Sequence, residues 1–187
     1  MNTKKTLSLA IVLLASTFVT SFAANAAEEI HSYVTGGLGY ANNSMAGSTY
    51  NHTAYNFGGG LLADTSVEHL QVGGELTYNY LGNETDYFTN GWTVYSESVD
   101  SYSLDFAGVA NYHVNDIAYL IGKAGASYQT LDYGFTTVTD TVPMLAAGVG
   151  FNATSKTSLT ATETVYFGSD DYTGQVASLM LNVKHTF

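Results

Sequence analysis

Apolar and polar residues alternate along most of the chain, and this alternation is typical of β-strands. It is clearest in the last nine residues, whose two parities are Leu179, Leu181, Val183 and Phe187 with His185, and Met180, Asn182, Lys184 and Thr186. Successive side chains of a strand point to opposite faces, so this segment has one apolar face and one mostly polar face. Such a strand at the end of a chain is suited to pairing with the first strand of a closed barrel.

The same alternation predicts eight strands in all. They are expected at about residues 30–40, 55–61, 69–80, 101–112, 118–128, 144–151, 157–167 and 179–187. Long connections are expected at residues 41–52, 81–99, 129–141 and 168–171, and short turns at 63–66, 115–116 and 154–156. Consecutive antiparallel strands joined in this way close into an up-and-down barrel. The predicted fold class is therefore all-β, an eight-stranded antiparallel up-and-down β-barrel.

The charged residues of these strands indicate that the barrel is transmembrane. Glu75, Asp105 and Lys123 all fall on the polar parity of their strands. A charge that faces hydrocarbon is costly, so the polar parity is expected inside the barrel and the apolar parity outside. A tilted strand crosses an outer membrane with about 9–11 residues, and most of the expected strands fit that length.

Aromatic residues on the apolar parity predict two belts at the membrane interfaces, where such side chains are favoured. The belt near the long connections comprises Tyr40, Tyr55, Tyr78, Tyr80, Tyr102, Tyr128 and Phe167, and the belt near the short turns comprises Tyr112, Phe151 and Phe187. Both belts are expected to contact outer-membrane lipid.

Residues 1–26 predict a secretory signal peptide, which leaves residues 27–187 as the barrel domain. Lys4 and Lys5 precede a mostly apolar stretch, and Ala24-Asn25-Ala26 fits a cleavage site. The alternative, a membrane-anchoring helix, is disfavoured by the small residues that follow Phe22.

The net charge restricts the partners. The whole chain has a formal net charge of −11, and after residue 26 only Lys123, Lys156 and Lys184 are basic. Nucleic acids require a basic face, so they are excluded as partners. The chain has no cysteine and therefore no disulfide framework. No cofactor is indicated.

Three segments carry a family resemblance: Tyr33 to Tyr40, Gly122 to Tyr128 and Leu179 to Phe187. Together with the strand pattern, they resemble the small outer-membrane barrels of the OmpA, OmpX and opacity-protein type. The resemblance implies a monomer in the outer membrane of a Gram-negative cell, in contact with lipid and lipopolysaccharide. It also implies that Leu179 to Phe187 is recognised by the outer-membrane assembly machinery. Such families include adhesins, serum-resistance factors and proteins of no assigned role.

The inward charges suggest an interior site. Glu75, Asp105 and Lys123 fall at similar heights on consecutive strands, which predicts an ion-pair cluster that fills the barrel. The alternative is a gated path for small ions along the same charges. Glu163 does not fit the pattern, because strict alternation turns it toward lipid. A bulge is expected to turn it inward, toward Lys184; the alternatives are a protonated or a partner-facing Glu163.

The expected loops are acidic and contain no basic residue. Their acidic residues are Glu84, Asp86, Glu97, Asp100, Asp132, Asp140, Asp170 and Asp171. They form either a solvated rim or a site for divalent cations that bridge to lipopolysaccharide phosphates or to another cell. Asp170-Asp171 with Gly168 is the best local candidate for such a cation, but no EF-hand spacing is present and no metal site is assigned.

Aromatic residues gather in the longest expected loop, namely Tyr87, Phe88, Trp92 and Tyr95. They either contact a surface receptor or pack on the barrel rim. Asn90-Gly91 favours a tight turn, so this loop is expected to form a hairpin that extends beyond the membrane.

An enzyme requires a nucleophile, a base and an orienting group within reach of one another. His52 is the one histidine near the outer face, and Ser44, Ser48 or Ser169 could in principle approach it, although nothing in the sequence requires this. A non-enzymatic protein is therefore predicted. The expected function is a structural or adhesin-like role at the cell surface through the long extracellular loops. The second candidate is a narrow pore for ions or small solutes, and the third is a lipid-modifying enzyme.

Overall fold

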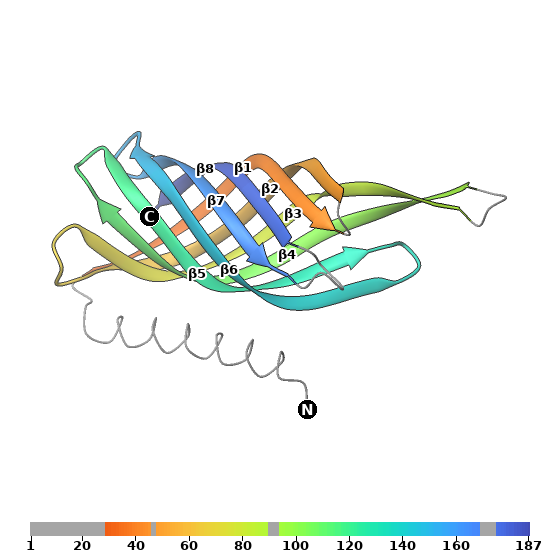
Figure 1. Cartoon of the computed structure of the whole chain (residues 1–187). Helices are drawn as coiled ribbons and strands as arrows, with labels where there is room; N and C mark the ends of the chain where they lie inside the picture. The colour runs from red at the N-terminus through yellow and green to blue at the C-terminus, as the bar shows by residue number, and fades with distance from the viewer. Residues whose placement is uncertain (1–28, 46–47, 90–93, 169–174) are drawn as a thin grey trace, which may run out of the picture.

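The protein is a single closed β-barrel, and its computed structural model describes residues 29–45, 48–89, 94–168 and 175–187. Its strands are β1 (Ile30–Met45), β2 (Ser48–Asp64), β3 (Leu70–Thr89), β4 (Val94–His113), β5 (Ala118–Asp132), β6 (Thr137–Asn152), β7 (Thr157–Phe167) and β8 (Gln175–Thr186). Each strand pairs antiparallel with the next, and β8 closes the barrel against β1 (Figure 1). The predicted eight-stranded up-and-down barrel is confirmed. The predicted signal peptide lies outside the described residues.

The outer surface of the barrel is apolar and its interior is polar. Leu76, Leu104 and Leu181 point outward and are 51, 46 and 65% exposed, whereas Glu75 is 7% exposed and faces the lumen. A soluble barrel that carries a ligand would place its leucines inside. Within the described part of the chain, no helix is long and apolar enough to cross a membrane.

Three of the expected loops are largely continuous β-structure. Pairing extends to Met45↔Ser48 between β1 and β2 and to Asp132↔Thr137 between β5 and β6. Between β3 and β4, eight further pairs continue from Gly82↔Ser101 to Thr89↔Val94. The long connections expected at 41–52, 81–99 and 129–141 are therefore hairpins built largely by extension of the strands, because backbone pairing continues where the apolar alternation has ended. The predicted hairpin between β3 and β4 is present, and Figure 1 shows its two strands extending far beyond the barrel, whereas the turn predicted at Asn90-Gly91 lies outside the described residues.

A bulge marks the point where this hairpin leaves the barrel. The register of β3 against β4 shifts between Tyr80 and Gly82, and the extra residue, Leu81, is fully buried. Gly82 has φ +120°, which side chains rarely tolerate, and His52 occupies the place that a side chain on Gly82 would take. Gly82 therefore allows the bulge, and the bulge shifts the alternation of side chains between the two faces of β3 by one residue where the hairpin begins.

Two interior tyrosines pack across glycines on the neighbouring strand. Tyr33 on β1 is paired with Gly60 on β2, and Tyr119 on β5 is paired with Gly150 on β6. A Cβ atom on Gly60 would lie 2.7 Å from the Tyr33 hydroxyl oxygen, and the Tyr119 ring occupies the corresponding place at Gly150. Both rings therefore lie along the inner wall of the barrel, in space that the glycines leave open.

Candidate functional site

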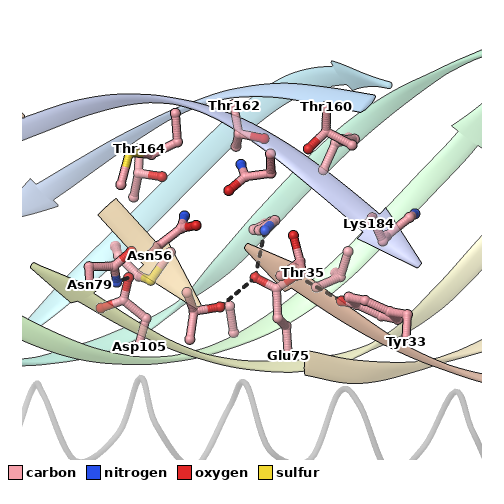
Figure 2. Close-up of a pocket in the computed structure, with 18 of the residues that line it drawn as sticks. Tyr33, Thr35, Asn56, Glu75, Asn79, Asp105, Thr160, Thr162, Thr164 and Lys184 are labelled. Atoms are coloured by element: carbon pink, nitrogen blue, oxygen red, sulfur yellow. Dashed lines mark hydrogen bonds and ion pairs between the residues drawn. The ribbon is translucent and has the colours of Figure 1, made fainter. Parts of the chain in front are cut away.

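The carboxylate of Glu75 is the centre of one polar network in the lumen (Figure 2). It forms an ion pair with Lys123, whose Nζ lies 2.6 Å from Oε1. It also accepts hydrogen bonds from the Tyr33 hydroxyl at 2.7 Å and from the Thr77 hydroxyl at 2.8 Å. The buried negative charge thus has one cation and two neutral donors, as a buried charge requires.

Small residues on the intervening strands allow these partners to meet. Tyr33 on β1 reaches Glu75 on β3 across Gly60 of β2, which is paired directly with Glu75. Lys123 on β5 reaches Glu75 across Ala107 of β4, which is its other direct neighbour. A larger side chain at either position would lie between the partners. The ion pair and the hydrogen bond from Tyr33 therefore depend on the small residues Gly60 and Ala107 as well as on the partners themselves.

Asp105 belongs to a second network, which contains no cation. Its carboxylate accepts hydrogen bonds from Ser127 Oγ at 2.6 Å, Asn79 Nδ2 at 2.8 Å and Tyr166 Oη at 2.8 Å. The expected single cluster with Lys123 is therefore wrong for Asp105. Its direct neighbour on β5 is Ser127, four residues from Lys123 and so about 13 Å away along the strand.

The ammonium group of Lys184 lies over two tyrosine rings rather than beside Glu163. Its Nζ is 4.5 Å from the centroid of the Tyr119 ring and 5.4 Å from that of the Tyr33 ring. Both distances are within the range of cation–π attraction. Tyr33 therefore takes part in the Glu75 network through its hydroxyl and contacts Lys184 through its ring.

The space left between these side chains is small. The Glu75 and Asp105 networks line one cavity of about 40 Å³, together with the threonines of β7 and the amides of Asn56 and Asn182. A cavity of this size holds about three water molecules. Buried oxygen atoms of the Asn56 and Asn182 side chains have no protein partner, so water is suited to satisfy them.

Glu163 faces outward, and the expected bulge in β7 is absent. Pairing is regular along β7 on both sides, with Glu163 opposite Ala147 of β6 and Leu179 of β8. Because no residue is inserted, the period-two alternation holds and Glu163 is exposed among the apolar residues of the outer face. The prediction that Glu163 turns inward toward Lys184 is therefore wrong. In this membrane-spanning barrel, Glu163 is an ionisable group at the lipid-facing surface.

Replacing Glu163 with leucine is expected to stabilise the barrel in a bilayer by about 1–2 kcal/mol, because it removes an acidic group from the lipid face. Urea unfolding in lipid vesicles measures the change, with Ala161→Leu on the same face of β7 as a control for added apolar area. An unchanged or lower stability of Glu163→Leu, relative to that control, would show that the carboxylate has a favourable partner at this surface.

The residues of the predicted outer belt gather most densely on β2, β3 and β4. The rings of Tyr55 and Tyr80 are stacked with centroids 4.8 Å apart, and Tyr102 lies 5.4 Å from Tyr80 and 6.2 Å from Tyr78. The other belt residues, Tyr40, Tyr112, Tyr128, Phe151, Phe167 and Phe187, are all exposed on the outer face. Their contact with the lipid interface stays a prediction.

Those acidic and aromatic residues of the long connections that the structure describes lie at the end of the barrel opposite the C-terminus. Asp100 accepts hydrogen bonds from Tyr80 at 3.1 Å and from Asn83 at 2.9 Å, so it joins the hairpin to the outer belt. The backbones of Tyr87, Phe88 and Tyr95 lie in the paired strands of the β3–β4 hairpin. Trp92, Asp170 and Asp171 lie outside the described residues.

The enzyme alternative requires a serine close to His52, and the register of β1 against β2 shows how far apart their backbones lie. His52 is paired with Ala41, and the backbone of Ser44 lies three pairs further along the same hairpin, which is about 10 Å. Ser48 is paired with Met45, one pair beyond Ser44, and Ser169 lies outside the described residues. The register therefore does not place Ser44 or Ser48 opposite His52.

The side chains that bond to the two carboxylates were not predicted from the sequence. Tyr33, Asn79 and Tyr166 hold the two carboxylates, and each lies on the inward parity of its strand. An inward tyrosine opposite a glycine is a usable signal for Tyr33. Tyr166 has no such signal, because its hydroxyl reaches Asp105 from β7 to β4 across the lumen.

A closed barrel with an apolar outer surface and a charged, filled interior defines a transmembrane β-barrel protein. A family model described as outer membrane protein beta-barrel domain matches residues 10–184. The chain therefore belongs to this family, and it is a protein of the bacterial outer membrane. No curated protein matches the sequence significantly.

Solved structures of small outer-membrane barrels share the fold. The attachment invasion locus protein Ail of Yersinia pestis, in complex with the heparin analogue sucrose octasulfate, aligns with a TM-score of 0.60 at 16% identity over 85% of this chain and 99% of Ail. Neisserial surface protein A aligns with a TM-score of 0.60 at 15% identity over 86% and 100% of the two chains. OprG from Pseudomonas aeruginosa aligns with a TM-score of 0.59 at 9% identity over 87% and 98%. At these identities the likeness is one of fold.

Proposed function

We propose that the protein is an adhesin-like surface protein whose long β3–β4 hairpin contacts a cationic partner outside the cell. The observation that carries the proposal is the hairpin itself, with its eight pairs beyond the row of Tyr80 and Tyr102. A strand needs only about 9–11 residues to cross the membrane, and β3 and β4 each have 20. The excess length is therefore available for contacts away from the lipid.

The charge of this end of the molecule supports a cationic partner. The segments that join the membrane-spanning strands there carry eight acidic residues and no lysine or arginine. Lys123 and Lys184 lie in the lumen, and Lys156 lies in the turn between β6 and β7. An acidic surface attracts cationic partners and repels polyanions. The partner is thus expected to differ in charge from the sulfated ligand bound by Ail.

Removing charge from the hairpin tests the proposal. Glu84→Gln, Asp86→Asn and Glu97→Gln together are expected to weaken binding of the folded protein in vesicles to a polylysine-coated surface by about tenfold, because each exposed ion pair contributes about 0.2–1 kcal/mol. Asp100 is kept because it bonds to Tyr80 and Asn83. The matched control neutralises Glu68 and Asp116, which lie in turns at the opposite end.

Shortening the hairpin tests whether attachment needs the hairpin itself, as distinct from the test of its charge above. Replacing residues 84–99 with Asn-Gly joins the paired residues Asn83 and Asp100 by a two-residue turn. Cells that carry this variant are expected to lose attachment while the barrel still folds, as judged by its mobility on gels without heating. Undiminished attachment, or tighter binding to heparin than to polylysine, would contradict the proposal.

The lumen favours this function over a pore. The cavity bordered by the Glu75–Lys123 ion pair has a volume of only about 40 Å³, which is small for a water-filled path. Reconstituted protein is expected to give no steady current in planar bilayers. A stable ion-selective current that Lys123→Met abolishes would instead favour the pore.

A further inference from the structure

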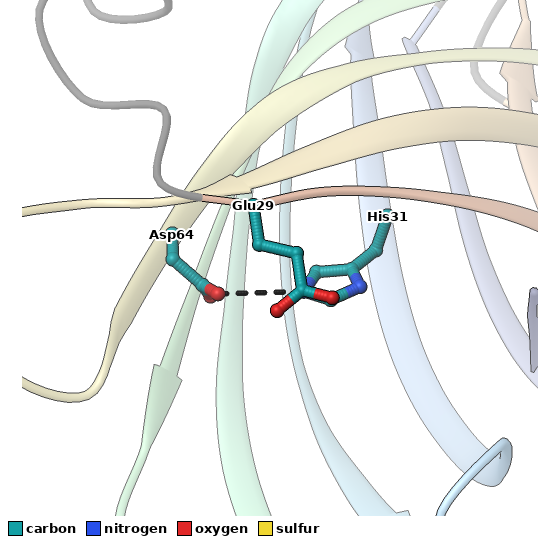
Figure 3. Close-up of side chains that lie close together, drawn as sticks. All are labelled: Glu29, His31 and Asp64. Atoms are coloured by element: carbon teal, nitrogen blue, oxygen red, sulfur yellow. Dashed lines mark hydrogen bonds and ion pairs between the residues drawn. The ribbon is translucent and has the colours of Figure 1, made fainter.

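A cluster of three metal-ligating side chains lies at the end of the barrel that carries the short turns, remote from the hairpin. Glu29 precedes β1, His31 lies on β1 and Asp64 ends β2. Figure 3 shows the three side chains converging, and their nearest ligand atoms all lie within 4.8 Å of one another. We propose that these residues bind a first-row divalent metal ion such as Zn²⁺.

The spacing of two of the ligand atoms already fits a metal ion. His31 Nε2 lies 3.3 Å from Asp64 Oδ2. A tetrahedral site with metal–ligand distances of about 2.0–2.1 Å has edges of about 3.3–3.4 Å, so the ion replaces the proton between these atoms without moving either group. Glu29 is exposed, and rotation of its side chain supplies the third ligand. Water fills the fourth position.

Neighbouring residues hold Asp64 in the orientation that the site needs. Gln71 Nε2 donates to Asp64 Oδ1 at 2.8 Å, which leaves Oδ2 directed at His31. The amide oxygen of Gln71 lies 3.2 Å from His113 Nε2, so β2, β3 and β4 form one chain of contacts behind the ligand. Outer partners of this kind raise the affinity of a metal site by fixing its ligands.

The backbone also fixes the distance between the ligands. The amide nitrogen of Asp64 donates to the carbonyl oxygen of Glu29 at 3.2 Å, and Ile30 is paired with Ala63. The three ligands thus come from the start of β1, with the residue that precedes it, and from the end of β2, two strands whose register is set by the barrel. One imidazole and two carboxylates suit Zn²⁺ better than Ca²⁺, which prefers six to eight oxygen ligands. The bound ion would clamp the start of β1 to the end of β2.

Titration of the folded full-length protein in detergent micelles with Zn²⁺ tests the site. One bound ion per chain is expected by calorimetry, and Co²⁺ is expected to give the visible absorption bands of a tetrahedral site. His31→Ala and Asp64→Asn should each weaken binding at least about tenfold, and Gln71→Leu by about tenfold through loss of orientation. Gel mobility without heating checks that each variant is folded.

His185→Ala is the matched control, because His185 is exposed at the same end and bonds to Thr157. It is expected to leave the Zn²⁺ affinity unchanged. The proposal is overturned if the wild-type protein binds no Zn²⁺, if His31→Ala binds it equally well, or if His185→Ala loses as much affinity as His31→Ala. These outcomes do not depend on the hairpin, so they are separate from the test of adhesion.

Discussion

Lys123→Met is expected to lower the free energy of unfolding by about 3–5 kcal/mol, the range found when one partner of a buried ion pair is removed. Glu75 is 7% exposed and would keep its hydrogen bonds from Tyr33 and Thr77 but lose the only cation bonded to it. An uncompensated charge would then remain inside a barrel whose cavity holds only a few waters. Urea unfolding in vesicles, followed by circular dichroism, gives the free energy.

A double variant separates the ion pair from the packing of the lysine chain. Glu75→Gln removes the charge that Lys123→Met leaves behind, so the two changes together should be less destabilising than Lys123→Met alone. Lys156→Met serves as the control, because Lys156 lies in an exposed turn. If the double variant is as unstable as the sum of both single changes, the two side chains are not coupled and the pairing does not hold Glu75 in the lumen.

The barrel could be predicted because alternation reports directly on which face a residue occupies. Leu181 and Val183 on one side, and Met180 and Asn182 on the other, were assigned correctly from parity alone. A shift by one residue would move every apolar side chain into the lumen, so the pattern fixes the faces strongly. The same rule places Glu75 and Lys123 inside from the sequence alone.

The length of the hairpins could not be predicted in this way. We expect no lipid on either face of the hairpin beyond Tyr80, so that its residues no longer need to alternate. Its pairing depends on backbone hydrogen bonds, which do not appear in a pattern of side-chain polarity. The glycine at position 82 was the one available signal that β3 changes its course there.

Glu163 shows where a sound physical rule gave the wrong geometry. The cost of a lipid-facing carboxylate is real, but a bulge would have displaced every later residue of β7 to the opposite face. Val165 and Phe167 would then point inward and Thr164 and Tyr166 outward. Regular pairing instead keeps the hydrogen bond from Tyr166 to Asp105 and leaves Phe167 on the outer face, with Glu163 exposed on the same face.

Interior partners were harder to predict than interior residues. Parity places a side chain in the lumen but does not say how far around the barrel it reaches. Tyr33 crosses a whole strand because Gly60 is small, and Tyr166 crosses the lumen from β7 to β4. These contacts depend on barrel curvature and side-chain length together, and neither is a property of one strand.

Asp105→Leu is expected to destabilise the barrel by about 3 kcal/mol or more. Asp105 is 6% exposed, and Ser127, Asn79 and Tyr166 all direct hydrogen-bond donors at it. Leucine has a similar size but accepts no hydrogen bond, so three donors lose this acceptor, and a buried unsatisfied group costs about 1–3 kcal/mol. Asp105→Asn keeps one acceptor oxygen and is expected to lose roughly half as much stability.

A variant of Tyr166 tests whether the loss of stability in Asp105→Leu comes from the unsatisfied hydrogen-bond donors or from a change in the shape of the site. Tyr166→Phe removes one donor to Asp105 and leaves two, so it should cost only about 1 kcal/mol. In the double variant with Asp105→Leu, the phenylalanine should restore part of the stability, because one donor no longer needs an acceptor. Urea unfolding of the four proteins gives the coupling free energy. A coupling near zero, or a fully stable Asp105→Leu, would mean that water replaces the carboxylate and that the network does not hold β4 to β7.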